Sequence, residues 1–98
     1  ADQPASLRTF LRRTAILEDL LPSLCNKLTG REDALAVLDR LERSGLFTFS
    51  LDAARTTYRY HTLFREFLLR CLQETEGEKA VRQLHRRAAA WFAERGEA

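Results

Sequence analysis

Apolar residues recur every three or four positions in three successive segments, and this spacing predicts three amphipathic helices. Pro22 suits the first turn of the second helix, and Gly30 and Gly45 suit the ends of the second and third. Thr29 and Glu32 have the spacing of a capping box for the third helix, although this role competes with Gly30 as a stop. The three stripes consist of Leu7, Phe10, Leu11 and Thr14; of Leu21, Leu24, Cys25 and Leu28; and of Ala34, Val37, Leu38 and Leu41.

The hydrophobic period then changes to two, which indicates a β-hairpin. Leu46–Ser50 predicts a strand with Phe47 and Phe49 on one face, and Thr57–Tyr60 predicts the return strand. The polar residues 52–56 between them suit a loop rather than a tight two-residue turn. The return strand is expected to place Tyr58 and Tyr60 on one face and Arg59 on the other.

Helical spacing resumes after the hairpin. A fourth helix is expected from about Thr62 to Glu74, with Thr62 as its N-cap. Gly77 separates it from a fifth helix, and Gly96 terminates that helix. The apolar stripes are Phe64, Phe67, Leu68 and Cys71 in the fourth helix, and Val81, Leu84, Ala88, Trp91 and Phe92 in the fifth.

Three helices, a two-stranded hairpin and a further helix form the element order of a winged helix, a variant of helix-turn-helix. We therefore expect a mainly α fold with a winged-helix domain over residues 1–76. Residues 77–98 would add one C-terminal helix, the first of a following helical superhelix. Because the chain starts at Ala1 without an initiator Met, we expect it to be a piece of a longer protein.

Composition narrows the function classes. Hydrophobic residues make up 45% and charged residues 31%, and the formal net charge is only +2, too balanced for a general nucleic-acid or membrane binder. No apolar run approaches the length of a membrane span, so a cytoplasmic protein is expected. Cys25 and Cys71 fall on apolar helix faces without zinc-ligand spacing, which predicts buried, reduced thiols. Without a phosphate-binding loop or an acid–base constellation, we expect a non-catalytic segment.

DNA recognition is the first hypothesis for a winged helix, and the third helix would enter the major groove. Its expected outward positions include Asp39 beside Arg40 and Arg43, and its entrance carries Glu32 and Asp33. Carboxylates repel phosphates, and this helix offers no Asn or Gln to read bases. The tip of the hairpin, which is the wing of the fold, offers DNA only one basic residue, Arg55. The basic run of residues 82–87 lies on the last helix and suits a face exposed to solvent. Direct DNA binding by this segment is therefore disfavoured, but it stays an alternative.

Several short motifs occur in one order: Phe10–Leu17, Leu28–Arg31, Leu41–Phe47, Tyr58–Arg65 and Leu84–Phe92. In this order they resemble one region of MalT-like bacterial transcriptional regulators, the large ATP-dependent LuxR-type activators of the STAND ATPase class. In that family an ATPase module precedes the winged helix, and a helical sensor superhelix and a separate DNA-binding domain follow. The resemblance implies that those neighbouring modules are this domain's partners within one polypeptide.

The resemblance also singles out His61. Residues 60–63 (Tyr-His-Thr-Leu) are similar to the Met-His-Asp-Leu element of plant resistance proteins and apoptotic activating factors. In those relatives the histidine reaches the β-phosphate of ADP and holds the resting state, so His61 and Thr62 are the candidate nucleotide-contacting residues. Thr62 stands where those relatives have Asp. The resemblance implies ADP or ATP bound mainly by the ATPase module, and no cofactor on this segment alone.

The residues independently support an anion contact there, because unpaired N–H groups and the dipole at a helix N-terminus favour negative charge. The alternative is a purely structural role, in which a partly buried His61 only caps the helix or packs under the wing. His85 lies on the same helix stripe as Val81, Ala88 and Phe92, so we expect it in the core or at an interface. Trp91 and Phe92 are expected to pack partly on the core and partly on a second copy. A protein-interaction module without nucleotide contact is a further alternative.

Overall fold

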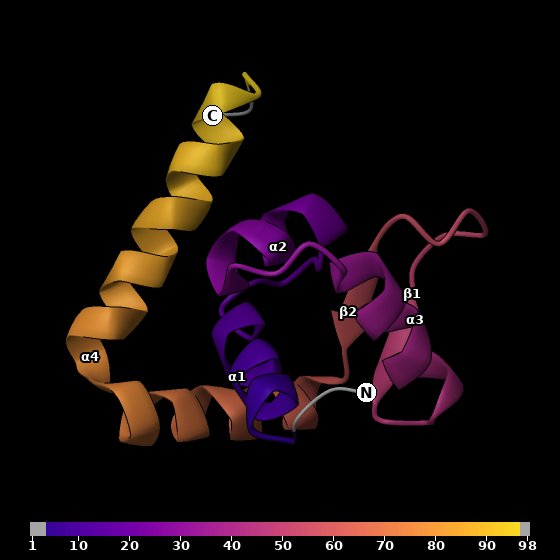
Figure 1. Ribbon diagram of the computed structural model, residues 1–98, viewed down its shortest axis with the longest axis horizontal. Helices are drawn as coiled ribbons and strands as arrows, with labels where there is room; N and C mark the ends of the chain where they lie inside the picture. Colours follow the sequence, from indigo (N-terminus) through magenta and orange to yellow (C-terminus); the bar gives the residue numbers. More distant parts are fainter. Residues whose placement is uncertain (1–3, 97–98) are drawn as a thin grey trace.

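The computed structural model describes residues 4–96. In chain order its elements are α1 (Pro4–Thr14), α2 (Pro22–Thr29), α3 (Ala34–Arg43), β1 (Thr48–Ser50), β2 (Tyr58–Tyr60) and α4 (Thr62–Glu94). Figure 1 shows α4 running below α1 and then turning away beside α2 towards the C-terminus, with α3 and the hairpin on the opposite side. The expected mainly α winged helix with a further helical segment is confirmed.

The ends of α2 and α3 follow local rules, with one correction. Pro22 is the first residue of α2, and Gly30 ends the helix in a left-handed conformation with φ of 75°. The predicted capping box for α3 is wrong, because α3 begins only after Asp33, whose side chain makes no capping bond. Instead, the side-chain oxygen of Asn26 accepts a hydrogen bond from the Ala34 N–H at 2.9 Å, so α2 caps α3.

The hairpin is antiparallel and shorter than predicted, since its first strand begins at Thr48 rather than Leu46. Phe47 has φ of 51°, a left-handed conformation that interrupts the extended chain. Thr48 is consequently the residue of β1 that faces the core. In β2 the predicted alternation is confirmed, because Tyr58 and Tyr60 are buried while Arg59 is half-buried.

The long helix α4 is broken at Gly77, as predicted. Gly77 has φ of 88° and ψ of 168°, a combination open essentially to glycine alone. The two halves of α4 meet at this residue at an angle (Figure 1). Whether residues 77–98 form a separate domain stays a prediction.

One core joins both halves of α4 to the rest of the fold. The prediction that Phe67 lies on the buried stripe of the fourth helix is wrong, because half of its surface is exposed. Trp91 is only 8% exposed, so its predicted packing on the core is confirmed. His85 is exposed, and its predicted core role is wrong. The largest fully buried side chains are Tyr58, Phe10, Leu20, Leu24, Leu28, Leu38, Leu41, Leu72, Val37, Thr14 and Cys25.

The two cysteines lie in different environments, and both are free thiols. Cys25 is buried as predicted, and this burial raises the pKa of its thiol to about 12. Cys71 is only partly buried, because the outer side of α4 is not covered there.

Candidate functional site

His61 lies at the joint between β2 and α4, where it is the N-cap residue of the helix. Thr62 was expected in that position, but it is the first residue of α4 itself. The His61 N–H donates to the Phe47 carbonyl at 2.9 Å, and the His61 carbonyl accepts from the Arg65 N–H at 2.9 Å. The His61 side chain makes no capping hydrogen bond and is exposed, so His61 caps α4 only through its backbone, and its ring is not sealed under the hairpin.

Aromatic rings of the hairpin flank the imidazole. The ring centroid of Phe49 lies 5.0 Å from that of His61, and the centroid of Phe47 lies 6.3 Å away in an edge-on arrangement. Phe64 packs against Phe47 at 5.5 Å from the side of α4. These rings give the imidazole a largely apolar surrounding on the protein side.

The surface around His61 is an open apolar hollow of about 910 Å³, which we call the His61 face. Leu63 is 80% exposed, Phe47 58% and Phe67 50%. Exposed apolar side chains that gather in one patch are characteristic of interaction surfaces. The residues that line the His61 face are Phe47, His61, Thr62, Leu63, Phe64 and Phe67.

Two polar links from α1 hold this joint in place. The Arg65 guanidinium donates to the carbonyls of Ala15 and Ile16 at 2.8 and 3.1 Å, just beyond the end of α1. The hydroxyls of Thr14 and Tyr60 are hydrogen-bonded at 2.7 Å inside the core. Burial raises the pKa of Tyr60 far above its ordinary value, so this phenol stays neutral.

The first turn of α4 presents backbone hydrogen-bond donors at one edge of the joint. The N–H groups of Thr62, Leu63 and Phe64 lie in the first turn of α4, where a helix offers no carbonyl partner. The helix dipole adds positive potential there, and an imidazole N–H can donate a further hydrogen bond. The rest of the lining is apolar, so these donors are confined to one edge of the His61 face.

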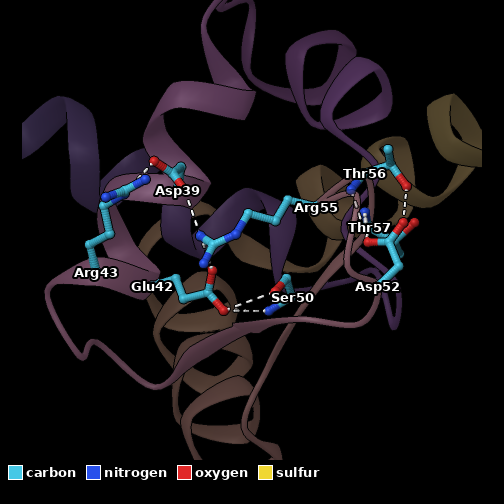
Figure 2. Close-up of polar contacts among 8 residues, drawn as sticks. All are labelled: Asp39, Glu42, Arg43, Ser50, Asp52, Arg55, Thr56 and Thr57. Carbon is cyan, nitrogen blue, oxygen red and sulfur yellow. Dashed lines mark hydrogen bonds and ion pairs between the residues drawn. The ribbon is translucent and has the colours of Figure 1, made fainter.

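Ser50 follows Phe49 in β1 and therefore points to the other side of the strand, towards α3. Figure 2 shows the polar contacts made there. The Arg55 guanidinium donates to Asp39 at 2.9 Å and to Glu42 at 2.8 Å. The other oxygen of Glu42 accepts from the Ser50 N–H at 2.8 Å and from the Ser50 hydroxyl at 3.0 Å. Asp39 also pairs with Arg43 at 2.7 Å. We call these five residues the α3–wing face.

Hydrogen bonds in this region favour the charged carboxylates. Arg43 contributes most to lowering the pKa of Asp39, and the Ser50 backbone N–H contributes most to lowering that of Glu42. In the wing loop, hydrogen bonds from Thr56 lower the pKa of Asp52.

The charges of the α3–wing face are therefore used within the domain. Arg43 and Arg55, which would have to meet DNA phosphates, are already paired with carboxylates. This arrangement supports the expectation that the segment does not bind DNA directly, which stays a prediction. Within residues 4–96, no group of three or more His, Cys, Asp or Glu side chains is arranged to hold a metal ion. No helix of the same range is long and apolar enough to span a bilayer.

Sequence patterns missed several of these contacts. The spacing of Asp39 and Arg43 indicates an ion pair along one helix turn, but Arg55 joins it only because the hairpin folds back. The hydrogen bonds from Arg65 to the carbonyls that follow α1, 49 and 50 residues away in the chain, have no local sequence signal. Phe47 and Phe49 were predicted on one face, but their approach to His61 was not foreseen.

Comparison with known proteins supplies the family. The profile of the MalT winged helix domain matches residues 1–80. The serine/threonine-protein kinase PknK of Mycobacterium tuberculosis is 39% identical over 90 residues, which cover 92% of this chain and 8% of the kinase. The HTH-type transcriptional regulator MalT of Vibrio campbellii is 40% identical over 88 residues, covering 87% and 9%. MalT of Klebsiella pneumoniae is 36% identical over 93 residues, covering 92% and 10%.

The chain thus spans about a tenth or less of these relatives' own lengths. The profile covers α1 to the start of the second half of α4, the same part that builds the hairpin and the His61 joint. The chain belongs to the MalT winged helix domain family.

Proposed function

We propose that this domain is the regulatory winged-helix module of a larger MalT-like, ATP-dependent transcriptional regulator. It would couple the ADP or ATP state of an adjacent ATPase module in the same polypeptide to the opening of the domains. The observation that carries the proposal is the exposed His61 imidazole beside the uncapped first turn of α4. The regulator would be cytoplasmic, and we assign no catalytic step to this domain.

In the resting state, His61 would donate a hydrogen bond to a phosphate oxygen of ADP held by the ATPase module. Thr62 would add its first-turn N–H or hydroxyl to the same group. A ligand shifts a conformational equilibrium only by its different affinities for the two states. One hydrogen bond to a charged group contributes about 1.5–3 kcal/mol, enough to change the population of a closed state by roughly ten- to a hundredfold.

The names of the relatives support a regulatory role for this module. Two are named transcriptional regulators and one is named a protein kinase, yet each contains a segment similar to this chain. A module shared by proteins of such different outputs fits a regulatory role better than a role in the output chemistry. A helical sensor domain following Gly77 would be its second neighbour.

The test is His61→Ala in the intact parent protein, with His85→Ala as the matched control, because His85 is the chain's other histidine and is also exposed. We expect His61→Ala to speed ADP release about ten- to a hundredfold and to raise basal transcription, while His85→Ala leaves both unchanged. Unchanged ADP retention together with unchanged basal output in His61→Ala would reject the nucleotide contact.

A protein-interaction module without nucleotide contact is the second candidate, favoured by the apolar lining of the His61 face. In that case Leu63→Ser would loosen the resting state while His61→Ala would not. Self-association through Trp91 and Phe92 stays a separate prediction. Trp91 is 8% exposed and its ring is covered by the Arg95 guanidinium at 3.6 Å, which leaves Phe92 as the more accessible of the two.

A further inference from the structure

We propose that Phe47 and Phe49 are positioning residues that hold the His61 imidazole in one outward orientation. The inference rests on the proposed function, since the orientation matters only if His61 contacts a phosphate. It assigns a role to two aromatic side chains whose partial exposure the core does not explain.

The first argument is the placement of the rings. Phe49 follows the buried Thr48 in β1, so its ring lies on the other side of the strand. The Phe47 ring, although its left-handed backbone lies outside the strand, contacts the same imidazole. The Phe49 ring lies 5.0 Å from the imidazole with an angle of 53° between the planes. The Phe47 ring lies 6.3 Å away at 85°, an edge-on contact. The imidazole is thus flanked by the rings of two residues at the start of the hairpin.

The second argument is the backbone of Phe47. Its φ of 51° is left-handed, an uncommon and unfavourable conformation for a bulky side chain. Such conformations persist where the surroundings impose them, and they concentrate at functional sites. Here the same residue provides a ring beside the imidazole and the carbonyl that accepts the His61 N–H at 2.9 Å. Phe47 therefore fixes both the backbone and one side of His61.

The third argument is what His61 lacks. Its side chain makes no capping hydrogen bond, and an exposed side chain without such a bond samples several rotamers. Ordering it at the moment of contact costs entropy, which weakens binding. Ring contacts made beforehand reduce that cost. The ring centroid of Phe64 lies 5.5 Å from that of Phe47 and 5.6 Å from that of the buried Tyr60. Phe64 therefore connects the exposed rings to the core.

The first experiment measures the order of the two imidazoles by NMR relaxation in the 98-residue protein. His85, on the second half of α4, is the internal reference, and Leu63→Ala is the control because it removes apolar surface from the same face. We expect a rigid His61 ring in the unaltered protein and in Leu63→Ala. In Phe49→Leu and in Phe47→Leu its order parameter should fall to about 0.6 or lower, the flexible range. A His61 ring that is equally ordered in both variants would overturn the proposal.

The second experiment is a double-substitution cycle on ADP release in the parent protein. Phe49→Leu should speed release less than His61→Ala, and the combined variant should release ADP no faster than His61→Ala alone. Additive effects would show that Phe49 acts independently of His61 and would overturn the proposal. If His61→Ala itself leaves release unchanged, the proposed function fails, while the NMR result still decides whether the rings hold the imidazole.

Discussion

The two sides of the hairpin differ in how many of their side chains have partners within the domain. On the α3–wing face, Arg55 joins two carboxylates of α3, and Glu42 also accepts from Ser50. On the His61 face, large apolar side chains are exposed and the imidazole has no capping bond. One three-residue strand, β1, separates a face that is closed by its own ion pairs from a face that is open.

The difference shows why position in a fold does not predict function. In a DNA-binding winged helix, α3 would be the reading element. Here its outward charges are held by the wing, and the candidate contact lies instead where the hairpin meets α4. The proposed contact therefore rests on the exposed apolar area and the first-turn N–H groups of the His61 face, and not on the position of α3.

Both faces depend on one core, so the largest expected effect is the loss of both together. Phe10 is fully buried in α1, and Phe10→Ala should lower the free energy of unfolding by about 3–5 kcal/mol. Urea unfolding followed by circular dichroism and by the fluorescence of Trp91, the chain's single tryptophan, measures it. The two probes should report one transition. A loss below about 1 kcal/mol, or a transition confined to one probe, would contradict a shared core.

Acid should affect the two faces unequally. The folded-state pKa values of Asp39, Glu42 and Asp52 are lowered, so their contribution to stability is present above the ordinary values of 3.8 and 4.5. It is lost as the pH falls through the lower folded values. The lining of the His61 face contains no carboxylate.

Amide NMR signals recorded from pH 6 down to about pH 2 measure this difference. The signals of β1 and the wing should change before those of the first turn of α4, which lines the His61 face. Asp39→Asn with Glu42→Gln should weaken this pH dependence. Simultaneous loss of all signals in both proteins would contradict the comparison.

The same double substitution should open the α3–wing face to DNA. Asp39→Asn with Glu42→Gln releases Arg43 and Arg55 from their carboxylates. The unaltered chain should bind duplex weakly, and the variant should gain a salt-dependence slope of about 0.9 for each new phosphate contact. Asp52→Asn is the control, because Asp52 bonds to Thr56 and Thr57 and holds no cation. Strong, steeply salt-dependent binding by the unaltered chain would restore the DNA hypothesis.

The smallest effect on stability is expected at the exposed side chains of the His61 face. Leu63→Ser should change the free energy of unfolding by no more than about 0.5 kcal/mol, because little of the Leu63 side chain is buried. Phe67→Ser should cost about 1 kcal/mol, because half of that ring is buried. Leu72→Ser, at a fully buried position of the same helix, should be strongly destabilising. Comparable losses in all three variants would mean that the His61 face is part of the core.

The sequence alone determined the regular elements and the family. The 3.6-residue spacing predicted α1 to α3 and both halves of α4, because each helix must bury one stripe. Gly30 and Gly77 marked breaks that only glycine accommodates easily. The ordered motifs indicated the MalT-like winged helix, and the same resemblance singled out His61.

Only the tertiary structure decided which stripe residues are covered and which charges meet. Phe67 and His85 lie on apolar stripes yet are exposed, because no other element packs over those positions. Arg55 reaches Asp39 and Glu42 across 16 and 13 residues, and Phe49 reaches His61 across the hairpin. Such contacts depend on how elements distant in the chain are placed, and local periodicity carries no information about that placement.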